Sequence, residues 1–258
     1  MNPDELADRM RQGEVFHSLR MLPGAWAVLR VDGRGFSRLT AERYEKPFDI
    51  RFHEAMVRTA STLLEDFQGL YAYTQSDEIS VLFRPEWSLF DREVEKLVSL
   101  SAGLASATFT HAAGAPAAFD GRVWLGADVG AVVDYFRWRQ SDATRCALNG
   151  WCYWTLRKEG WSAAKATREL DGSTVGSKNE LLFQRGINFN EVPLWQRRGT
   201  GITWERYLKE GVDPRDGRRV PTERRRLKAD SELPMKEEYE AWLRRVLEDS
   251  EPRSRDER

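Results

Sequence analysis

The stretch AWAVLRVDGRGFSRLT, residues 25–40, decides the fold together with LYAYTQSDEISVLF, residues 70–83. In the first stretch, a short apolar run at 26–31 has glycines near both ends. Its length and its β-branched residues predict a buried strand rather than a helix. We expect this strand to end at Asp32.

The second stretch alternates apolar and polar residues on either side of residues 75–78, which read QSDE. This alternation predicts a β-hairpin whose turn displays Asp77 and Glu78. If the first strand lies beside this hairpin, the carboxylates of Asp32 and Asp77 meet at one end of a sheet. A pair of this kind can hold divalent cations, which indicates phosphoryl chemistry.

The residue types around Asp32 suit Mg²⁺ and a nucleotide. Mg²⁺ takes oxygen ligands at about 2.1 Å and is usually held by one or two carboxylates, waters and substrate phosphates. Gly33 and Gly35 carry no side chains, so their backbone can approach a triphosphate, and the Gly33 carbonyl can serve as a metal ligand. The simpler interpretation is an ordinary turn and an acidic hairpin tip that only aids solubility. The two stretches together favour the metal site.

The order of predicted elements gives the fold class. Apolar residues at helical spacing predict helices over 52–67 and 90–109, and residues 122–125 predict a further strand. The resulting order β-α-β-β-α-β is the ferredoxin-like arrangement of a polymerase palm. We therefore expect an α+β fold, an antiparallel sheet with helices packed on it and additional C-terminal helices. Function does not follow from this arrangement alone, because unrelated proteins share it.

Three regions are expected along the chain. Residues 1–140 form a palm-like catalytic domain that starts with a short helix. Residues 141–200 form a helical extension that completes the nucleotide site, reached by a helix that is broken near Ser141. Residues 201–258 are a charged segment, partly helical and then disordered at the end.

Composition limits the class of protein. The chain has 258 residues, 41% of them hydrophobic and 31% charged, which suffices for one large core or two small ones. No stretch approaches the roughly 18 apolar residues of a membrane span, and the charged N-terminus does not resemble a signal sequence. We expect a cytoplasmic protein without membrane contact. Cys146 and Cys152 do not form a metal or disulfide pattern, so they are interpreted as buried thiols.

Two further patterns have alternative interpretations. Residues 215–228 contain seven Arg or Lys against two acidic residues although the net charge of the chain is −1. Arg224, Arg225 and Arg226 therefore either contact RNA phosphates or form a solvated surface. The aromatic residues between 135 and 154 are interpreted mainly as core, although some could stack on bases.

Six separated blocks of the sequence form a recognisable set. They are LRVDGRGF (29–36), EKPFD (45–49), QSDEIS (75–80), FDGRV (119–123), DYFRWRQSD (134–142) and SKNELLFQRGINFN (177–190). In this order and spacing they resemble the tRNA-His guanylyltransferase superfamily, in particular its guanylyltransferase-like branch of 3′-to-5′ RNA polymerases. The similarity covers about residues 15–200.

This resemblance implies a Mg²⁺-dependent nucleotidyltransferase that adds nucleotides to the 5′ end of tRNA, at the acceptor stem. ATP would activate the 5′-monophosphate as an adenylylated end, which the 3′-hydroxyl of GTP or another nucleoside triphosphate then attacks. Two Mg²⁺ ions would be held by Asp32, Asp77 and the Gly33 carbonyl, with Glu78 as ligand or helper. The resemblance also implies a homotetramer.

The resemblance assigns further residues. The expected catalytic residues are Asp32, Asp77, Glu78, Lys46 and Asp49. The expected nucleotide-binding residues are Asp32, Gly33, Arg34, Gly35, Phe36, Ser37, Ser76, Asp77, Arg122, Lys178 and Asn190. The expected RNA contacts are Arg139, Arg224, Arg225 and Arg226.

Two of these residues have structural alternatives. Asp49 precedes a predicted helix and is well placed to cap it, which competes with a role beside Lys46 in the activation step. Residues 177–180, SKNE, match a capping box that would start a helix. Lys178 therefore either approaches the triphosphate, as the resemblance implies, or has no functional duty.

A departure from the family bears on the substrate. Members that add one guanosine to tRNA-His carry a His-Ile-Asn-Asn run after the WRQxD block, but residues 144–147 here read TRCA. The hydrogen-bonding amides are missing, which favours template-dependent repair of 5′-truncated tRNA over tRNA-His-specific guanylyl transfer.

Other function classes are disfavoured. A nucleotide cyclase would explain the acids but not the WRQSD block, and a non-catalytic RNA-binding module would not need the acids. Residues 172–178 lack the ending of a Walker A loop. The three histidines form no patterned pair for zinc or nucleophilic catalysis.

Overall fold

Six strands form one antiparallel sheet with the order β4-β1-β3-β2-β5-β6 in the computed structural model, which describes residues 2–212, 215 and 218–249. The strands are β1 (Trp26–Arg34), β2 (Tyr71–Gln75), β3 (Glu78–Phe83), β4 (Ala118–Gly126), β5 (Thr200–Val212) and β6 (Arg219–Asp230). The α-helices are α1 (Pro3–Arg11), α2 (Phe36–Arg43), α3 (Ile50–Asp66), α4 (Val94–Ala113), α5 (Val129–Lys158), α6 (Ala163–Leu170), α7 (Val175–Phe183), α8 (Leu194–Arg198) and α9 (Lys236–Asp249). Short 3₁₀ helices occupy Val15–Ser18, Leu89–Arg92 and Phe189–Glu191.

The predicted palm arrangement is confirmed. The order β1-α3-β2-β3-α4-β4 is the expected β-α-β-β-α-β, and the sheet is antiparallel throughout. The strand β1 continues two residues beyond Asp32, because its pairing with β4 extends to Arg34. Among the described residues, no helix is both long and apolar enough to cross a lipid bilayer.

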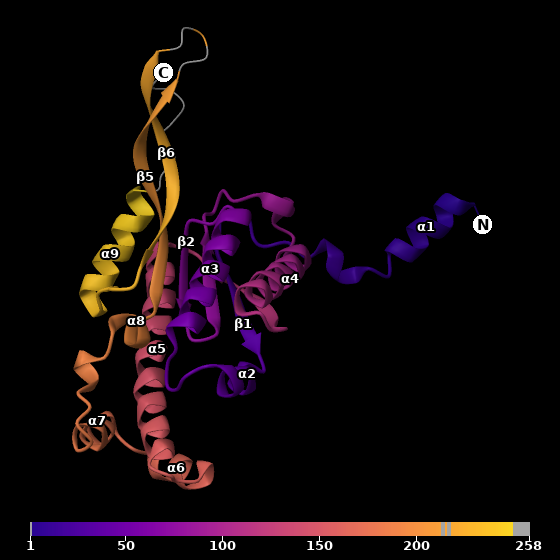
Figure 1. Ribbon diagram of the computed structural model, residues 1–258. Helices are drawn as coiled ribbons and strands as arrows, with labels where there is room; N and C mark the ends of the chain where they lie inside the picture. Colours follow the sequence, from indigo (N-terminus) through magenta and orange to yellow (C-terminus); the bar gives the residue numbers. More distant parts are fainter. Residues whose placement is uncertain (1, 213–214, 216–217, 250–258) are drawn as a thin grey trace.

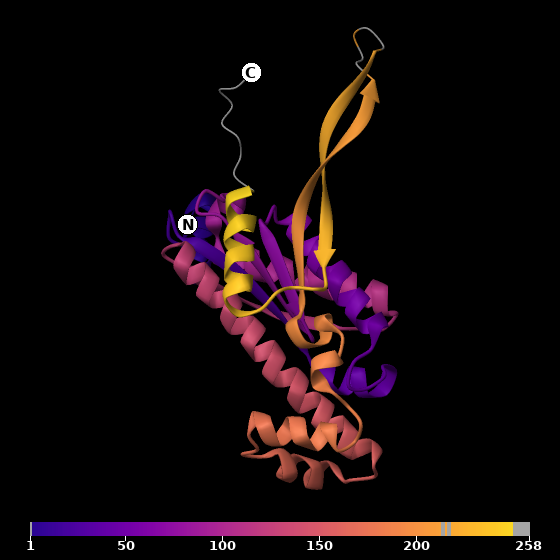
Figure 2. The same cartoon turned by 90° about the vertical axis from the view of Figure 1, so that its left-hand side faces the viewer.

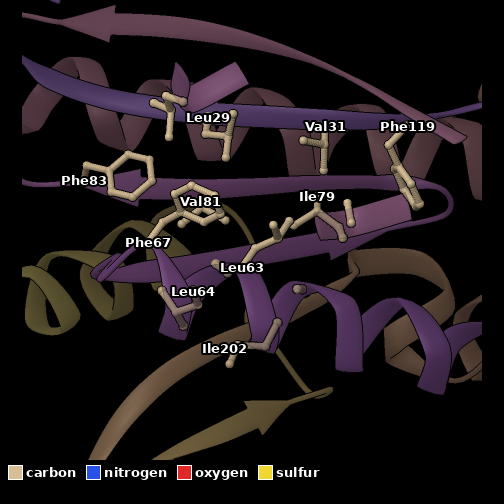
Figure 3. Close-up of a cluster of buried hydrophobic side chains, with 14 of the residues drawn as sticks. Leu29, Val31, Leu63, Leu64, Phe67, Ile79, Val81, Phe83, Phe119 and Ile202 are labelled. Atoms are coloured by element: carbon tan, nitrogen blue, oxygen red, sulfur yellow. The ribbon is translucent and has the colours of Figure 1, made fainter. Parts of the chain in front are cut away.

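Helices cover both faces of the sheet (Figures 1 and 2). Helices α3 and α4 pack on one face, where the largest core cluster lies (Figure 3). That cluster draws Leu29 and Val31 from β1 and Ile79 and Val81 from β3, which the alternation of strand side chains places on the same face. The helices α5 and α9 cover the other face, with Tyr71, Phe136 and Tyr239 at the centre of a second cluster. Two buried layers therefore hold the end of β1 and the β2–β3 turn in fixed positions.

The helix α5 differs from the prediction. It runs without a break from Val129 to Lys158, so the expected interruption near Ser141 and the expected domain boundary at residue 140 both fall inside one helix. At this point Asp142 forms (i, i+3) ion pairs with Arg139 and Arg145, which favour the helical conformation. The distal half of α5 packs on α6 and α7 and forms a third cluster around Cys152 and Leu182. Cys152 is buried as expected, whereas Cys146 is exposed.

The segment after residue 200 also differs from the prediction. The strands β5 and β6 form a long twisted hairpin that joins the sheet through β2 and projects from the body (Figure 2). The expected short helix is present as α9, with Tyr239, Leu243 and Leu247 buried. The disorder expected at the end of the chain falls outside the described residues. At the other end, α1 buries no residue and lies apart from the body (Figure 1).

Candidate active site

The end of β1 and the β2–β3 turn form one structural unit. Asp32 lies opposite Glu78 in the β1–β3 pairing, and the Gly33 amide donates a hydrogen bond to the Asp77 carbonyl oxygen at 3.0 Å. This bond attaches the turn to the strand. The two stretches that the sequence marked as acidic therefore meet at one end of the sheet.

The turn itself is tight and strained. Ser76 has a φ of 52°, a left-handed conformation that a non-glycine residue rarely adopts. Its hydroxyl donates a hydrogen bond to Asp77 Oδ1 at 3.0 Å. This bond fixes the carboxylate of Asp77 relative to the strand ends.

Both carboxylates suit a cation. Burial and the nearby Asp32 carboxylate raise the pKa of Asp77 above its ordinary value. No ion pair with Asp32 or Asp77 is present among the described residues, so neither carboxylate is neutralised by an arginine or lysine at contact distance. Two close, unneutralised carboxylates match the donor set of Mg²⁺, and the Gly33 carbonyl lies beside them.

The backbone after Asp32 leads directly into α2. A Cβ atom on Gly33 would come within 2.5 Å of the Phe36 ring, which is buried, so only glycine fits there. Gly35 caps α2 with a φ of +75°, and because glycine has no side chain, the cap residue itself leaves the first amides of the helix without a side-chain acceptor. Free amides at a helix N-terminus favour anions such as phosphate. The exposed Arg34 and Ser37 flank this turn.

An open cavity of about 510 Å³ lies between this turn, the hairpin and α5. Its lining includes Ser37, Ser76 and Asp77, and α5 contributes aromatic side chains at Tyr153 and Trp154. A smaller cavity of about 80 Å³ adjoins it, between residues 44–53, the hairpin and Trp195. Both cavities share Lys46.

Lys46 lies between the two cavities. Its Nζ donates a hydrogen bond to Thr40 Oγ1 at 2.5 Å and lies 5.4 Å from the centre of the Trp154 ring. Burial lowers the pKa of Lys46, and the Asp77 carboxylate opposes this shift. Although 31 positions separate Lys46 from Asp77 in sequence, the fold brings both into the same cavity.

Asp49 has the capping role that its position predicted. Its Oδ1 accepts a hydrogen bond from the Arg51 amide at 2.8 Å, and Oδ2 accepts one from the Glu45 amide at 2.9 Å. The Arg51 guanidinium also binds this carboxylate and holds its pKa far below the ordinary value. Asp49 thus fixes the loop that carries Lys46 and also lines the smaller cavity.

Glu78 and Arg139 are bound to each other. Arg139 Nε and Nη2 lie 2.7 and 2.8 Å from the two carboxylate oxygens of Glu78, and both side chains are largely buried. Arg139 also binds Asp142. The Arg139 guanidinium is therefore engaged within the protein, and the expected RNA contact at Arg139 stays a prediction. Glu78 is likewise less free to bind a metal than Asp32.

With this geometry in place, the chain can be compared with known proteins. Residues 7–126 match the family model described as tRNAHis guanylyltransferase, and residues 130–243 match the one described as Thg1 C terminal domain. A tRNA(His) guanylyltransferase from Debaryomyces hansenii is 33% identical over 228 residues, which cover 82% of this chain and 86% of that protein. This chain belongs to the tRNA(His) guanylyltransferase family. It is therefore a nucleotidyltransferase.

Other members of the family agree. A mouse relative described as a probable tRNA(His) guanylyltransferase is 33% identical, and the match covers 72% of this chain and 66% of the mouse protein. Two solved structures of a bacterial tRNA(His) guanylyltransferase-like protein, in complex with GTP and with ATP, are 26% identical. Their TM-scores are 0.69 and 0.71, and each match covers 95% of this chain and 98% of theirs. The Saccharomyces cerevisiae enzyme is 25% identical with a TM-score of 0.67, over 72% of this chain and 88% of that one.

Three of the residues expected to bind the nucleotide, Arg122, Lys178 and Asn190, line neither of the two cavities. Arg122 is on β4, where it pairs with Asp120, and it lines neither cavity. Lys178 is on α7, which begins after Thr174 rather than at the predicted capping box, because the Thr174 side chain caps it. Asn190 is exposed beside α7, and its carbonyl accepts a hydrogen bond from Arg197 at 2.8 Å.

The three arginines at 224–226 lie on β6, where their side chains alternate between the two faces of the hairpin. Arg226 pairs with Glu205 across the strands, whereas Arg225 lies over the Trp204 ring on the other face. The sequence contained a signal for this hairpin. Residues 213–217 contain proline and glycine, which are typical of a turn, but the runs on either side lack the apolar alternation of a half-buried strand.

Several residues at the cavities were not singled out from the sequence. His53 stacks on Trp195 with ring centres 4.3 Å apart, and burial lowers its pKa to about 4. It is therefore a neutral wall of the smaller cavity at pH 7. Tyr153 and Trp154 belong to the aromatic residues that were interpreted mainly as core, with base stacking as the alternative, and both line the larger cavity.

A second group of possible metal ligands lies close to the start of β1, at His17, Glu93 and Glu95. The buried Glu93 carboxylate also lies 3.7 Å from Arg20 and 3.6 Å from Lys96. Because these cations already neutralise it, we interpret Glu93 as the anchor of the N-terminal segment rather than as a metal ligand.

Proposed function

We propose that this enzyme adds nucleotides in the 3′-to-5′ direction to the 5′ end of tRNA and fills in missing 5′ nucleotides by pairing with the opposite strand of the acceptor stem. The observation that carries the proposal is the convergence of Asp32 and Asp77 beside a cavity that also contains Lys46. Family membership supports the nucleotidyl transfer, and the complexes of bacterial relatives with GTP and ATP support these nucleotides as substrates.

The acids at the end of β1 would hold Mg²⁺. Two ions bound by Asp32, Asp77 and the Gly33 carbonyl would lower the pKa of the attacking hydroxyl and neutralise the leaving phosphates. The amides at the start of α2 and the Ser76 hydroxyl, which lines the larger cavity, would bind the triphosphate. Lys46 adds a positive charge in the same cavity, beside the Trp154 ring on which a base could stack.

The residues at 144–147 support repair rather than guanosine addition to tRNA-His. Thr144 Oγ1 donates its hydrogen bond within the protein, to Gln140 O at 3.1 Å or Arg197 O at 2.8 Å. Ala147 is buried. These side chains hold α8 and the core, and they offer no amide that could recognise an added guanosine.

We also infer that the enzyme assembles with copies of itself, as a homotetramer. The N-terminal segment exposes apolar side chains that a lone chain leaves in water, among them Phe16, Leu19 and Leu22, each more than half exposed. Light scattering on the purified protein tests the tetramer, and a monomer at micromolar concentration would contradict it.

The proposed reaction is tested by incubating the protein with Mg²⁺, labelled nucleoside triphosphates and a 5′-truncated tRNA. Extension of the RNA is expected, and Asp32→Ala should reduce its rate by several orders of magnitude. The matched control is Asp66→Ala, at an exposed aspartate that ends α3, which should retain the wild-type rate. A cyclic nucleotide product, binding without extension, or a normal rate in Asp32→Ala would contradict the proposal.

A further inference from the structure

Two arginines face each other across neighbouring strands at one corner of the sheet. Arg30 on β1 lies directly opposite Arg122 on β4, the edge strand. Both belong to the face of the sheet that α5 covers, because Trp124, two residues after Arg122, packs on Tyr135 of α5. Like charges directly opposite each other destabilise a sheet, so this pair needs a compensating anion.

Acidic side chains in the protein neutralise the charges of Arg30 and Arg122 only in part. Arg122 is more than half exposed and contacts Asp120 through one nitrogen at 3.0 Å. Arg30 Nε lies 3.8 Å from Glu78, whose carboxylate already accepts two hydrogen bonds from Arg139. Arg30 Nε is buried and has no hydrogen-bond partner among the residues that the structure describes. A buried donor without a partner beside an exposed guanidinium indicates a place for a ligand oxygen.

An aromatic ring borders the same corner. Trp138 of α5 is 52% exposed, although the Arg139 guanidinium lies 4.4 Å and the Arg30 guanidinium 5.7 Å from its centre. Tyr135 contacts it edge-on at 5.8 Å. These contacts hold the ring in place and leave part of it open to solvent. A fixed, half-exposed tryptophan is a stacking surface for a nucleic acid base.

The position of the corner relative to the acids is decisive. Asp32 lies two residues beyond Arg30 on the same face of β1, and it adjoins the turn whose Asp77 lines the larger cavity. Asp32 therefore lies between the corner and the cavity. In a phosphoryl transfer the attacking and leaving oxygens lie roughly in line, so the two reactants need separate places around the metal ligands.

We propose that the corner formed by Arg30, Arg122 and Trp138 binds the phosphorylated 5′ end of the RNA. Arg122 and Arg30 contact the 5′-phosphate, and Trp138 stacks on the terminal base. The cavity on the other side of Asp32 then holds the incoming nucleotide. This inference rests on the proposed function, and it gives Arg122 a role at the RNA end instead of at the triphosphate.

The test compares a hairpin RNA that carries either a 5′-monophosphate or a 5′-hydroxyl, by fluorescence anisotropy in Mg²⁺ buffer without nucleotide. The wild-type protein should bind the phosphorylated RNA about tenfold more tightly, the effect of one charge-assisted hydrogen bond. Arg122→Gln should abolish the preference for the phosphorylated RNA without weakening the binding of the RNA that carries a 5′-hydroxyl. Arg122→Lys should retain part of the preference. Trp138→Ala should weaken both RNAs and keep the preference.

The matched control is Arg168→Gln, at an exposed arginine on α6 that donates a hydrogen bond to the Ala164 carbonyl oxygen of its own helix. It should behave like the wild type. A preference that persists in Arg122→Gln, or a wild type without preference, overturns the proposal. If inorganic pyrophosphate binds but Trp138→Ala leaves both RNAs unaffected, the corner holds free anions and the proposal also fails.

Failure of this inference can be told apart from failure of the proposed function by a parallel extension assay on the same RNA with a 5′-triphosphate. If the RNA is extended but the protein shows no binding preference for a phosphorylated end, only the proposal about the corner is overturned. If no RNA is extended, the proposed function is overturned, and the ratio of the two affinities still decides whether the corner recognises a phosphate.

Discussion

The Gly33 amide donates a hydrogen bond to the Asp77 carbonyl oxygen at 3.0 Å, and this contact ties the first acidic strand to the acidic turn. It uses only backbone atoms. The spacing of Asp32 and Asp77 is therefore set by the sheet itself and depends little on neighbouring side chains. The active site is expected to be as rigid as the core beneath it, provided that residue 33 has no side chain.

A methyl group at position 33 should disturb this contact. In Gly33→Ala, the new Cβ would meet the buried Phe36 ring at 2.5 Å, so the strand end or the ring must shift. Overpacking of this kind costs about 1 to 3 kcal/mol of unfolding free energy, and the extension rate should fall with it. Chemical denaturation and single-turnover extension measure both effects.

Gly103→Ala is the matched control for that substitution. It lies within α4, where a Cβ meets nothing within 4 Å, so alanine should stabilise the helix by up to about 1 kcal/mol and leave activity unchanged. Equal stability and rate in wild type and Gly33→Ala would show that the close contact with Phe36 has no role.

The raised pKa of Asp77 predicts a trade-off between stability and activity. Because the folded-state pKa lies above the unfolded one, this group favours folding at low pH, and that contribution is lost as pH rises through the folded pKa. At neutral pH without metal, Asp77→Asn should therefore raise the melting temperature, and the difference should vanish in acid below the ordinary aspartate pKa.

Mg²⁺ should reverse the order of the melting temperatures, so that the wild type becomes more stable than Asp77→Asn. At a concentration of 100 Kd, a cation that binds only the folded protein adds about 2.7 kcal/mol of stability to the wild type, and Asp77→Asn should gain much less. Differential scanning fluorimetry with and without Mg²⁺ measures this. The same gain in both proteins would remove Asp77 from the metal site.

Lys46 is predicted to act mainly in activation of the RNA end. Lys46→Ala should impair 5′-adenylylation of a monophosphorylated RNA more than nucleotide addition to an RNA that already carries a 5′-triphosphate. Lys158→Ala, at the exposed end of α5, is the control. Equal losses on both RNAs would leave Lys46 with a binding role common to both steps, consistent with its position between the two cavities.

The palm could be predicted from sequence because its signals are local. Alternating residues with a period of two determine which side chains of β1 and β3 share a face, and the tight turn sets the register of β2 against β3. The pairing of Arg139 with Glu78 could not be predicted in this way. It depends on which turn of α5 crosses the sheet at Glu78, and periodicity within one helix does not fix that position.

Two further features, the position of Lys46 and the β5–β6 hairpin, could not be predicted from the sequence for physical reasons. The position of Lys46 beside Asp77 depends on a loop held by Asp49, whose path no residue pattern specifies. The β5–β6 hairpin was missed because charged residues dominate both strands. Their pairing across the strands, as in Arg226 with Glu205, replaces the apolar face that normally marks a strand.

The hairpin refines the expected RNA contacts. Arg224, Arg226 and Lys228 share one face of β6, whereas Arg225 lies on the other face over Trp204. If the first face contacts RNA, replacing its three cations with Gln should reduce the slope of log affinity against log salt by about 0.7 to 0.9 per lost contact. Arg225→Gln should leave the slope unchanged. A slope that does not respond to the triple substitution would make this face an ordinary solvated surface.

The central claim is that base pairing with the opposite strand, and not a side chain of the enzyme, selects the added nucleotide. Its most direct test is a set of 5′-truncated tRNAs that differ only in the templating base, each offered the four triphosphates in turn with Mg²⁺. The account predicts that the complementary nucleotide is added in every case, on tRNAs with different anticodons. Addition of guanosine whatever the opposing base, and only to tRNA-His, would contradict it.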